Sequence, residues 1–254
     1  MPESAIQVQE DHLCVISDLH LGNPIFRKNH SLGNFLKHLS RNGASLCING
    51  DGMDLLQFSV PKFAKDILSA FRTLKDFFLN GRNKIYYVLG NHDVFMKTFL
   101  EESGLFPVVS RLEVVSGDKR IHIEHGHLHD YLFQNYLKIY IKMARFFGKF
   151  VRTCPELFHV YFKIEWFIEW LVFSLKNKTF RGHGDASQDS PKYFQAAREI
   201  LSRGFDIVIF GHSHRHGLHV LEDGKIYANA GTWTSSRSHF LEILQGSISL
   251  QEWR

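Results

Sequence analysis

The sequence has little of what marks secreted, membrane-spanning or disordered proteins. Its 254 residues include only three cysteines, Cys14, Cys47 and Cys154. An odd, widely spaced set excludes a disulfide framework, and the first two lie in apolar runs that predict reduced core thiols. Residues 1–11 lack a basic start followed by an apolar run, so we expect no signal peptide and a cytoplasmic location. A hydrophobic content of 44% excludes disorder and suits a single domain spanning residues 1–254.

Histidine, in contrast, is abundant. The chain has 16 histidines, and eight of them fall within residues 122–129 and 212–219. Imidazole is the most common metal ligand among protein side chains. This clustering therefore points to metal chemistry.

Apolar, β-prone runs alternate with helix-like segments along most of the chain. The strand-like runs cover residues 12–17, 44–48, 84–89, 120–124 and 205–210. The helix-like segments cover residues 31–41, 61–80, 94–103 and 190–202. Further strands are expected at 225–229, 239–244 and 247–253, with Gly224 and Gly246 in hairpin turns. The alternation predicts an α/β layered fold, with a second sheet packed on the first.

Five short polar motifs each follow one of the first five strand-like runs. They are Asp18-Leu19-His20, Gly50-Asp51, Gly90-Asn91-His92-Asp93, His125-Gly126 and Gly211-His212-Ser213-His214. One such motif alone is usually a turn or a polar pair. All five in this order predict that the polar side chains gather along one edge of a sheet.

The residue types in these motifs suit a pair of divalent metal ions. Carboxylate, imidazole and amide oxygen are ligands that manganese, iron and zinc all accept, so the sequence does not distinguish these metals. Asp51 could bridge two ions about 3.5 to 4 Å apart, and such a pair activates a shared hydroxide. His92, beside the candidate ligand Asn91, is the candidate catalytic acid.

The remaining histidines divide into two groups. Surface or packing roles are expected for His30, His38, His159 and His239. The roles of His127, His129, His183, His216 and His219 remain open. The sequence His183-Gly184-Asp185 could replace His125-Gly126 as the fourth motif, but no strand-like run precedes it, which favours His125.

A segment of different composition, residues 130–181, lies between the fourth and fifth motifs. Residues 131–180 hold eight Lys or Arg against three Asp or Glu, a net charge of +5 in a chain whose total is +4, and 15 of the 35 aromatic residues. Two helices are predicted here, at about 131–152 and 156–176. Charged residues interrupt any run near the ~20 residues that a spanning helix needs. An interfacial helix or a lid is therefore expected, with an ordinary packed helical pair as the alternative.

The five motifs resemble the calcineurin-like metallophosphoesterase superfamily over nearly the whole chain. The resemblance implies a four-layer αββα sandwich, here with a helical cap insertion at about 130–181. It implies that one metal takes Asp18, His20, Asp51 and His214, and the other takes Asp51, Asn91, His125 and His212. It also makes His92 the catalytic imidazole, with Asp54 as its orienting partner.

Within that superfamily, the Ser17–Leu21 sequence SDLHL, the aromatic insertion and the turn Asn229-Ala230-Gly231-Thr232-Trp233 look like the branch of UDP-2,3-diacylglucosamine hydrolases of the lipid A pathway. That branch implies two Mn²⁺ ions and release of UMP and 2,3-diacylglucosamine 1-phosphate. It also implies a peripheral position on the inner face of the inner membrane, reached through the cap.

One departure keeps other substrates open: the best-known form of that hydrolase has Arg where this chain has His92. A soluble phosphatase or phosphodiesterase acting on another nucleotide, a phosphoprotein or nucleic acid is the alternative, although no basic and aromatic stripe outside the insertion indicates nucleic acid. A scaffold that lost catalysis is a further alternative, but no expected ligand is missing. Arg181, Arg215 and Lys138 are candidate phosphate contacts on charge and position.

Overall fold

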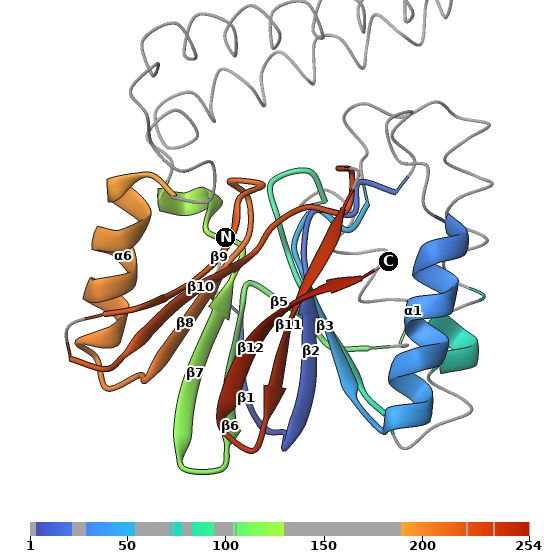
Figure 1. Cartoon of the computed structure of the whole chain (residues 1–254), viewed down its shortest axis with the longest axis horizontal. Coiled ribbons are helices and arrows are strands. Elements are labelled where there is room, and N and C mark those ends of the chain that lie inside the picture. The colour runs from blue at the N-terminus through green and yellow to red at the C-terminus, as the bar shows by residue number, and fades with distance from the viewer. Residues whose placement is uncertain are drawn as a thin grey trace, which may run out of the picture. The chain divides into compact units, whose positions relative to one another are not determined.

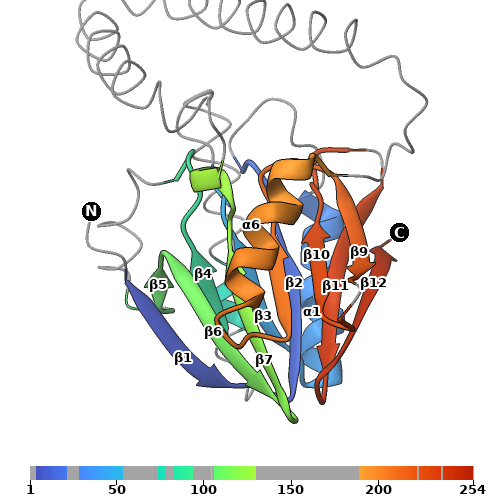
Figure 2. The ribbon, with the colours of Figure 1, turned by 90° about the vertical axis from the view of Figure 1, so that its left-hand side faces the viewer.

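Two six-stranded sheets and their covering helices form the part of the chain that is described (Figures 1 and 2). The computed structural model describes residues 4–21, 29–53, 72, 74–77, 83–93, 104, 106–129, 189–221, 223–235 and 237–253. One unit of the chain comprises Met1–His129 and Ser187–Arg254, and a second comprises Asp130–Ala186, which lies outside the described residues. The helical cap expected at 130–181 and the helix expected at 94–103 thus remain predictions. Of the helix expected at 61–80, the described residues 72 and 74–77 are helical.

The first sheet carries the first three motifs. In order across the sheet its strands are β12 (Ser247–Trp253), β11 (Ser238–Leu244), β2 (His12–Ile16), β3 (Ser45–Asn49), β4 (Ile85–Val88) and β5 (Val108–Val109). The four strands from β2 to β5 are parallel, and β11 runs antiparallel to both β2 and β12. Parallel β2, β3 and β4 therefore end at one edge.

The second sheet carries the last two motifs. Its strands in order are β1 (Ala5–Gln9), β6 (Arg111–Ser116), β7 (Lys119–Glu124), β8 (Ile207–Phe210), β10 (Ile226–Ala230) and β9 (His216–Val220). β7, β8 and β10 are parallel, whereas the β6–β7 and β9–β10 pairs are antiparallel. β7 and β8 thus also end at a common edge.

The two sheets face each other across a shared apolar core. Alternate residues of each strand point into it, as Leu13 and Val15 of β2 do against Ile121 of β7 and Ile209 of β8. The opposite face of the first sheet packs on α1 (Asn29–Asn42), and that of the second packs on α6 (Pro191–Leu201). These four layers confirm the expected αββα sandwich, which Figure 1 shows with α6 and α1 on its two outer sides.

The five apolar runs that were predicted as central strands form β2, β3, β4, β7 and β8. β1, β5, β6 and β9 were not predicted. The burial of β6 alternates residue by residue, and in β9 only Gly217 is buried, so the sequences of β6 and β9 carry too little apolar character to be recognised as strands. Among the described residues, no helix is long and apolar enough to cross a membrane.

Candidate metal centre

All five motifs begin where a strand ends. Asp18 follows β2, Asp51 follows β3, and Asn91 follows β4 in the first sheet, while His125 follows β7 and His212 follows β8 in the second. Backbone hydrogen bonds join these loops: the Asp18 amide donates to the Gly50 carbonyl at 3.1 Å, and the Gly211 amide donates to the His125 carbonyl at 3.1 Å. Neighbouring loops are therefore joined within each sheet.

The backbone at this edge is held in an unusual conformation. In the described part of the chain, six residues other than glycine have a positive φ angle, and five of them are Asp18, His20, Asp51, His212 and His214. Left-handed backbone costs an ordinary residue about 1–2 kcal/mol, and such strain concentrates at functional sites. The fold thus retains a costly backbone at five of the seven predicted ligands.

The structure brings six of the seven predicted ligands, together with His92, into three overlapping groups. Within each group the potential ligand atoms lie within 4.8 Å of one another. The groups are Asp18 with His20 and His214, His20 with Asp51 and His92, and Asp51 with His125 and His212. We call Asp18, His20, Asp51, Asn91, His125, His212 and His214 the strand-end cluster.

Several polar atoms in this cluster are buried without a hydrogen bond. They are Asp18 Oδ1, Asn91 Oδ1 and His125 Nε2. Asp18 Oδ1 lies 3.1 Å from His214 Nε2, and His125 Nε2 lies 3.2 Å from Asp51 Oδ2, so each carboxylate faces an imidazole across a short gap. Buried polar atoms are otherwise almost always hydrogen-bonded. Oxygen and nitrogen donors left in this state fit divalent metal ions.

Asp18 is held from several sides. Its Oδ2 atom accepts hydrogen bonds from Ser17 Oγ and from the His212 amide, the latter at 3.1 Å, and its carbonyl accepts one from Thr232 Oγ1 at 3.0 Å. Burial alone would raise the pKa of Asp18, but the nearby imidazoles of His214 and His125 lower it to about 2. Asp18 is therefore a carboxylate whose Oδ1 atom faces the imidazole of His214.

His125 and Asp51 form the corresponding pair beside the second sheet. The Nδ1 atom of His125 donates to the Asn49 carbonyl at 2.9 Å, which leaves Nε2 directed at Asp51. Such a backbone partner fixes which nitrogen a metal would meet. Burial would lower the pKa of His125, but Asp51 and Asp18 raise it to about 9, and the pKa of Asp51 is held well below its ordinary value. A proton on His125 thus balances two buried carboxylates, a task that a divalent cation can take over.

Two glycines allow the loops to approach this closely. Gly50 has a φ of +78°, and a Cβ atom there would collide with the ring of His125. A Cβ at Gly90 would collide with the carboxylate of Asp51. Any side chain at either position would push a ligand out of place.

His92 lies at the centre of the group but differs from the ligands in its contacts. Its amide donates to Asp51 Oδ1 at 2.9 Å, and its ring is half-buried with its centroid 4.9 Å from that of His20. Its predicted partner Asp54 is outside the described residues. An imidazole at this place can reach a substrate bound beside Asp51.

Asp93, which the motif contains but to which the sequence assigned no role, joins two of the loops. Its Oδ2 atom accepts hydrogen bonds from the Gly52 amide at 3.0 Å and from Tyr87 Oη at 2.7 Å, and its Oδ1 accepts one from the Gly90 amide at 2.6 Å. Burial and the negative charge of Asp51 raise its pKa to about 6. Only the loop geometry reveals this connection.

A second unpredicted network supports the last motif. The side chain of Asn229 donates to the Gly211 carbonyl at 2.9 Å and to Asp189 Oδ2 at 3.0 Å, and Tyr227 Oη donates to the same carboxylate at 2.6 Å. All three side chains are buried. The network fixes the turn that carries His212, and the only sequence signal for it was the expected strand at 225–229.

The histidines whose roles the sequence left undecided mainly pack against other side chains near the strand-end cluster or in the second sheet. His127 has its ring centroid 5.5 Å from that of His125, and burial together with the charges of His125 and His212 lowers its pKa to about 3. His129 pairs with Glu124 Oε1 at 2.5 Å. His216 stacks on the buried His239 at 3.6 Å, and His219 stacks on Tyr227 at 5.9 Å. His183 lies outside the described residues.

Two of the three candidate phosphate contacts lie outside the residues that the structure describes. Arg215 is exposed and directly follows His214, and its amide donates to Ser213 Oγ at 3.4 Å. Lys138 and Arg181 lie outside the described residues. Of the three, the structure thus places Arg215 next to the strand-end cluster.

Comparisons with known proteins agree with this geometry. The calcineurin-like phosphoesterase family matches residues 12–216, which include all five motifs. Among curated proteins there is no match.

Solved structures show weaker likenesses. A predicted phosphoesterase from Streptococcus pneumoniae is 15% identical with a TM-score of 0.43, covering 95% of this chain and 88% of its own. A Vps29 variant from Entamoeba histolytica is 16% identical with a TM-score of 0.43, covering 95% and 97%. A Thermotoga maritima protein is 14% identical with a TM-score of 0.47, covering 96% and 98%.

Proposed function

Because this chain belongs to the calcineurin-like phosphoesterase family, a family of metal-dependent phosphoester hydrolases, we propose that it cleaves the pyrophosphate bond of a nucleotide-linked lipid. The proposed substrate is UDP-2,3-diacylglucosamine, with UMP and 2,3-diacylglucosamine 1-phosphate as products. The convergence of carboxylate, amide and imidazole groups around Asp18 and Asp51 carries the hydrolase assignment. The substrate rests on the sequence resemblance and on the insertion.

In this proposal the strand-end cluster holds two divalent cations, with Mn²⁺ the first choice. Asp18, His20 and His214 would hold one ion, and Asn91, His125 and His212 would hold the other. Asp51 would be shared, since it belongs to two of the three donor groups. When bound, such a pair polarises the phosphate and activates the attacking water.

The residues of the chain supply orientation and charge balance. The Asn49 carbonyl fixes the ring of His125, and the His92 amide together with the Gly90 turn fixes the carboxylate of Asp51. Donors that are pre-placed in this way need not reorganise when charge develops on the phosphate. The left-handed backbone at five ligands is the cost of that placement.

His92 is the proposed acid. Its half-buried ring lies beside His20 and Asp51. From this position a ring nitrogen of His92 would give a proton to the departing phosphate oxygen. A positioned acid contributes about 10²–10⁴-fold to a rate. Asp54 is proposed to orient the imidazole.

The nucleotide-lipid assignment uses the composition of residues 131–180. Cations suit phosphates and headgroups, and aromatic side chains suit acyl chains. Lys138 of this region, Arg181 directly after it, and Arg215 are proposed phosphate contacts. The same region would place the protein on the inner face of the inner membrane.

The assay that tests the substrate uses Mn²⁺-loaded protein and three substrates in parallel: UDP-2,3-diacylglucosamine, bis(p-nitrophenyl) phosphate and a soluble UDP-sugar. The proposal predicts UMP from the lipid at a rate far above that for the soluble UDP-sugar, and no product from the Asp51→Asn protein. Cleavage of the phosphodiester without UMP from the lipid would reject the lipid and leave the hydrolase assignment standing. Failure of all three would reject both.

His92 favours a second candidate, a phosphodiesterase or phosphatase acting on a soluble nucleotide. The residue departs from the Arg of the best-known nucleotide-lipid hydrolase. In the same assay, faster turnover of the soluble UDP-sugar than of the lipid would select this candidate.

A further inference from the structure

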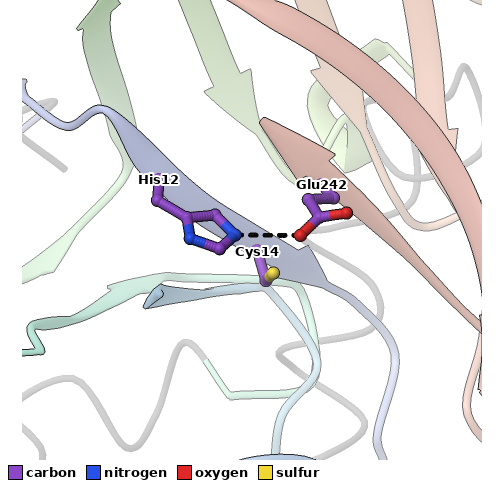
Figure 3. Close-up of side chains that lie close together, drawn as sticks. All are labelled: His12, Cys14 and Glu242. Carbon is purple, nitrogen blue, oxygen red and sulfur yellow. Dashed lines mark hydrogen bonds and ion pairs between the residues drawn. The ribbon is translucent and has the colours of Figure 1, made fainter. Parts of the chain in front are cut away.

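A second group of metal-ligating side chains lies at the other end of β2. His12 Nε2 is 2.9 Å from Glu242 Oε1, and the potential ligand atoms of His12, Cys14 and Glu242 all lie within 4.8 Å of one another. Figure 3 shows the three side chains gathered where β2 and β11 run side by side. We call these three residues the β2–β11 cluster.

Strand register explains why the three meet. His12 and Cys14 are two residues apart in β2, so they point to the same face of the sheet. Glu242 of β11 is the direct antiparallel partner of Cys14, and such partners have Cβ atoms about 4.5–5.5 Å apart. Leu13, between His12 and Cys14, points to the opposite face and into the core between the sheets. The cluster is therefore a product of regular sheet geometry.

The β2–β11 cluster is separate from the strand-end cluster. The two share no residue, and β2 rises about 3.3 Å per residue, so Cys14 lies roughly 10 Å or more before Asp18. The strand-end cluster offers only nitrogen and oxygen donors, whereas this one includes a thiol. The two groups therefore prefer different metals.

The donor set suits zinc or a similar thiolate-binding ion. Cysteine sulfur, histidine nitrogen and glutamate oxygen are all established zinc ligands, and two ligands about 2.0–2.1 Å from a tetrahedral ion lie about 3.3 Å apart. The present 2.9 Å between His12 and Glu242 needs only a small widening to reach that value. The His12 and Glu242 side chains are 20% and 33% exposed and Cys14 is buried, so solvent can supply a fourth ligand from the side of His12 and Glu242.

We propose that His12, Cys14 and Glu242 form a metal site for Zn²⁺ or another thiolate-preferring divalent ion, additional to the strand-end cluster. The ion joins β2 to β11 on the face that packs against α1, and a water molecule completes its coordination. Binding replaces the thiol proton of Cys14, which is released to solvent, and a bond forms between the thiolate sulfur and the ion. The site stabilises the strand whose other end leads to Asp18.

Co²⁺ spectroscopy on the full-length, metal-depleted chain tests this proposal. A thiolate bound to Co²⁺ gives a charge-transfer absorption that nitrogen and oxygen ligands do not give, so the strand-end cluster is silent in this measurement. We expect the absorption to appear and saturate as Co²⁺ is added, after allowance for the two further ions that the strand-end cluster takes up, and to disappear in Cys14→Ser. Cys47→Ser is the matched control, because Cys47 is also a buried strand cysteine but faces the core between the sheets, and it should retain the signal.

Two further variants guard against misfolding of Cys14→Ser. His12→Gln and Glu242→Gln alter partly exposed side chains, and each should weaken Co²⁺ binding at the thiolate site by about tenfold or more, as loss of a supporting partner alone does at other metal sites. Far-ultraviolet circular dichroism would verify their folding. No thiolate absorption at saturating Co²⁺, or a signal that persists in Cys14→Ser, would overturn the proposal. Because the readout is not enzymatic, its failure is distinct from failure of the proposed function.

Discussion

The two ends of β2 carry metal-ligating side chains on very different backbones. At the carboxyl end, Asp18 and His20 have φ angles of 54° and 50°, and their loop is tied to the loop of Asp51. At the amino end, His12 and Cys14 lie in a regular strand and meet Glu242 through ordinary register. One arrangement is strained and built from five loops, whereas the other follows from the pairing of two strands.

The strand-end cluster and the β2–β11 cluster therefore depend on the fold in different ways. Strain is retained where several ligands must be fixed before substrate arrives, and it has to be offset by bonds such as those of Asp93 and Asn229. A site on a regular strand needs no such support, but its ligands are less tightly placed. We therefore expect catalysis at the strained end and binding alone at the regular end.

The substitution Asp51→Asn should have the largest effect, because it should disable the strand-end cluster and leave the β2–β11 cluster intact. The substitution removes the shared carboxylate charge, so the rate of phosphoester hydrolysis should fall by more than the ~10⁴-fold upper range of a single acid–base group. Metal content should fall by two ions per chain, measured by elemental analysis. The Co²⁺ thiolate absorption should be unchanged, and its loss would show that the two ends are not independent.

Replacing His92 should affect chemistry without affecting metal content. His92→Gln is expected to lower kcat by about 10²–10⁴-fold, because the acid is lost while the ligands remain. The measurement is kcat on bis(p-nitrophenyl) phosphate beside metal stoichiometry. A loss of bound metal equal to the loss of rate would instead make His92 a ligand.

Gly50 and Gly43, both in the left-handed conformation, give a matched test of close approach. Both have a positive φ, but a Cβ at Gly50 meets His125, whereas at Gly43 it meets nothing within 4 Å. Gly43→Ala should lower the free energy of unfolding by about 1–2 kcal/mol and leave kcat/KM intact. Gly50→Ala should in addition lower kcat/KM by about a hundredfold, the scale expected for a displaced catalytic group. Equal activity in the two variants would refute the importance of this contact.

Zinc binding at the β2–β11 cluster should stabilise the folded protein measurably. In the Asp51→Asn protein, Zn²⁺ at about 100 times the Kd of the β2–β11 cluster should add about 2.7 kcal/mol to the free energy of unfolding. For a chain of this size that corresponds to a rise in Tm of roughly 5–10 °C. The same titration of an Asp51→Asn, Cys14→Ser double variant is the control, and an equal rise there would place the ion elsewhere.

The sequence predicted most residues of the strand-end cluster but not the β2–β11 cluster. Apolar runs located the central strands, and the motif order predicted which side chains follow them, because both are local properties of the chain. The hydrogen bonds of Asp93 to Gly52 and of Asn229 to Gly211 depend on where distant loops meet. Cys14 is the free, buried thiol that the sequence predicted, but its neighbour Glu242 comes from β11, whose register no local pattern determines.

The most direct test of the central claim is a crystal structure of the Mn²⁺-loaded protein with anomalous scattering data at the manganese edge. We expect two peaks about 3.5 to 4 Å apart, with Asp51 between them. Asp18, His20 and His214 should surround one peak, and Asn91, His125 and His212 the other. A single peak, or two peaks that do not share Asp51, would contradict this claim.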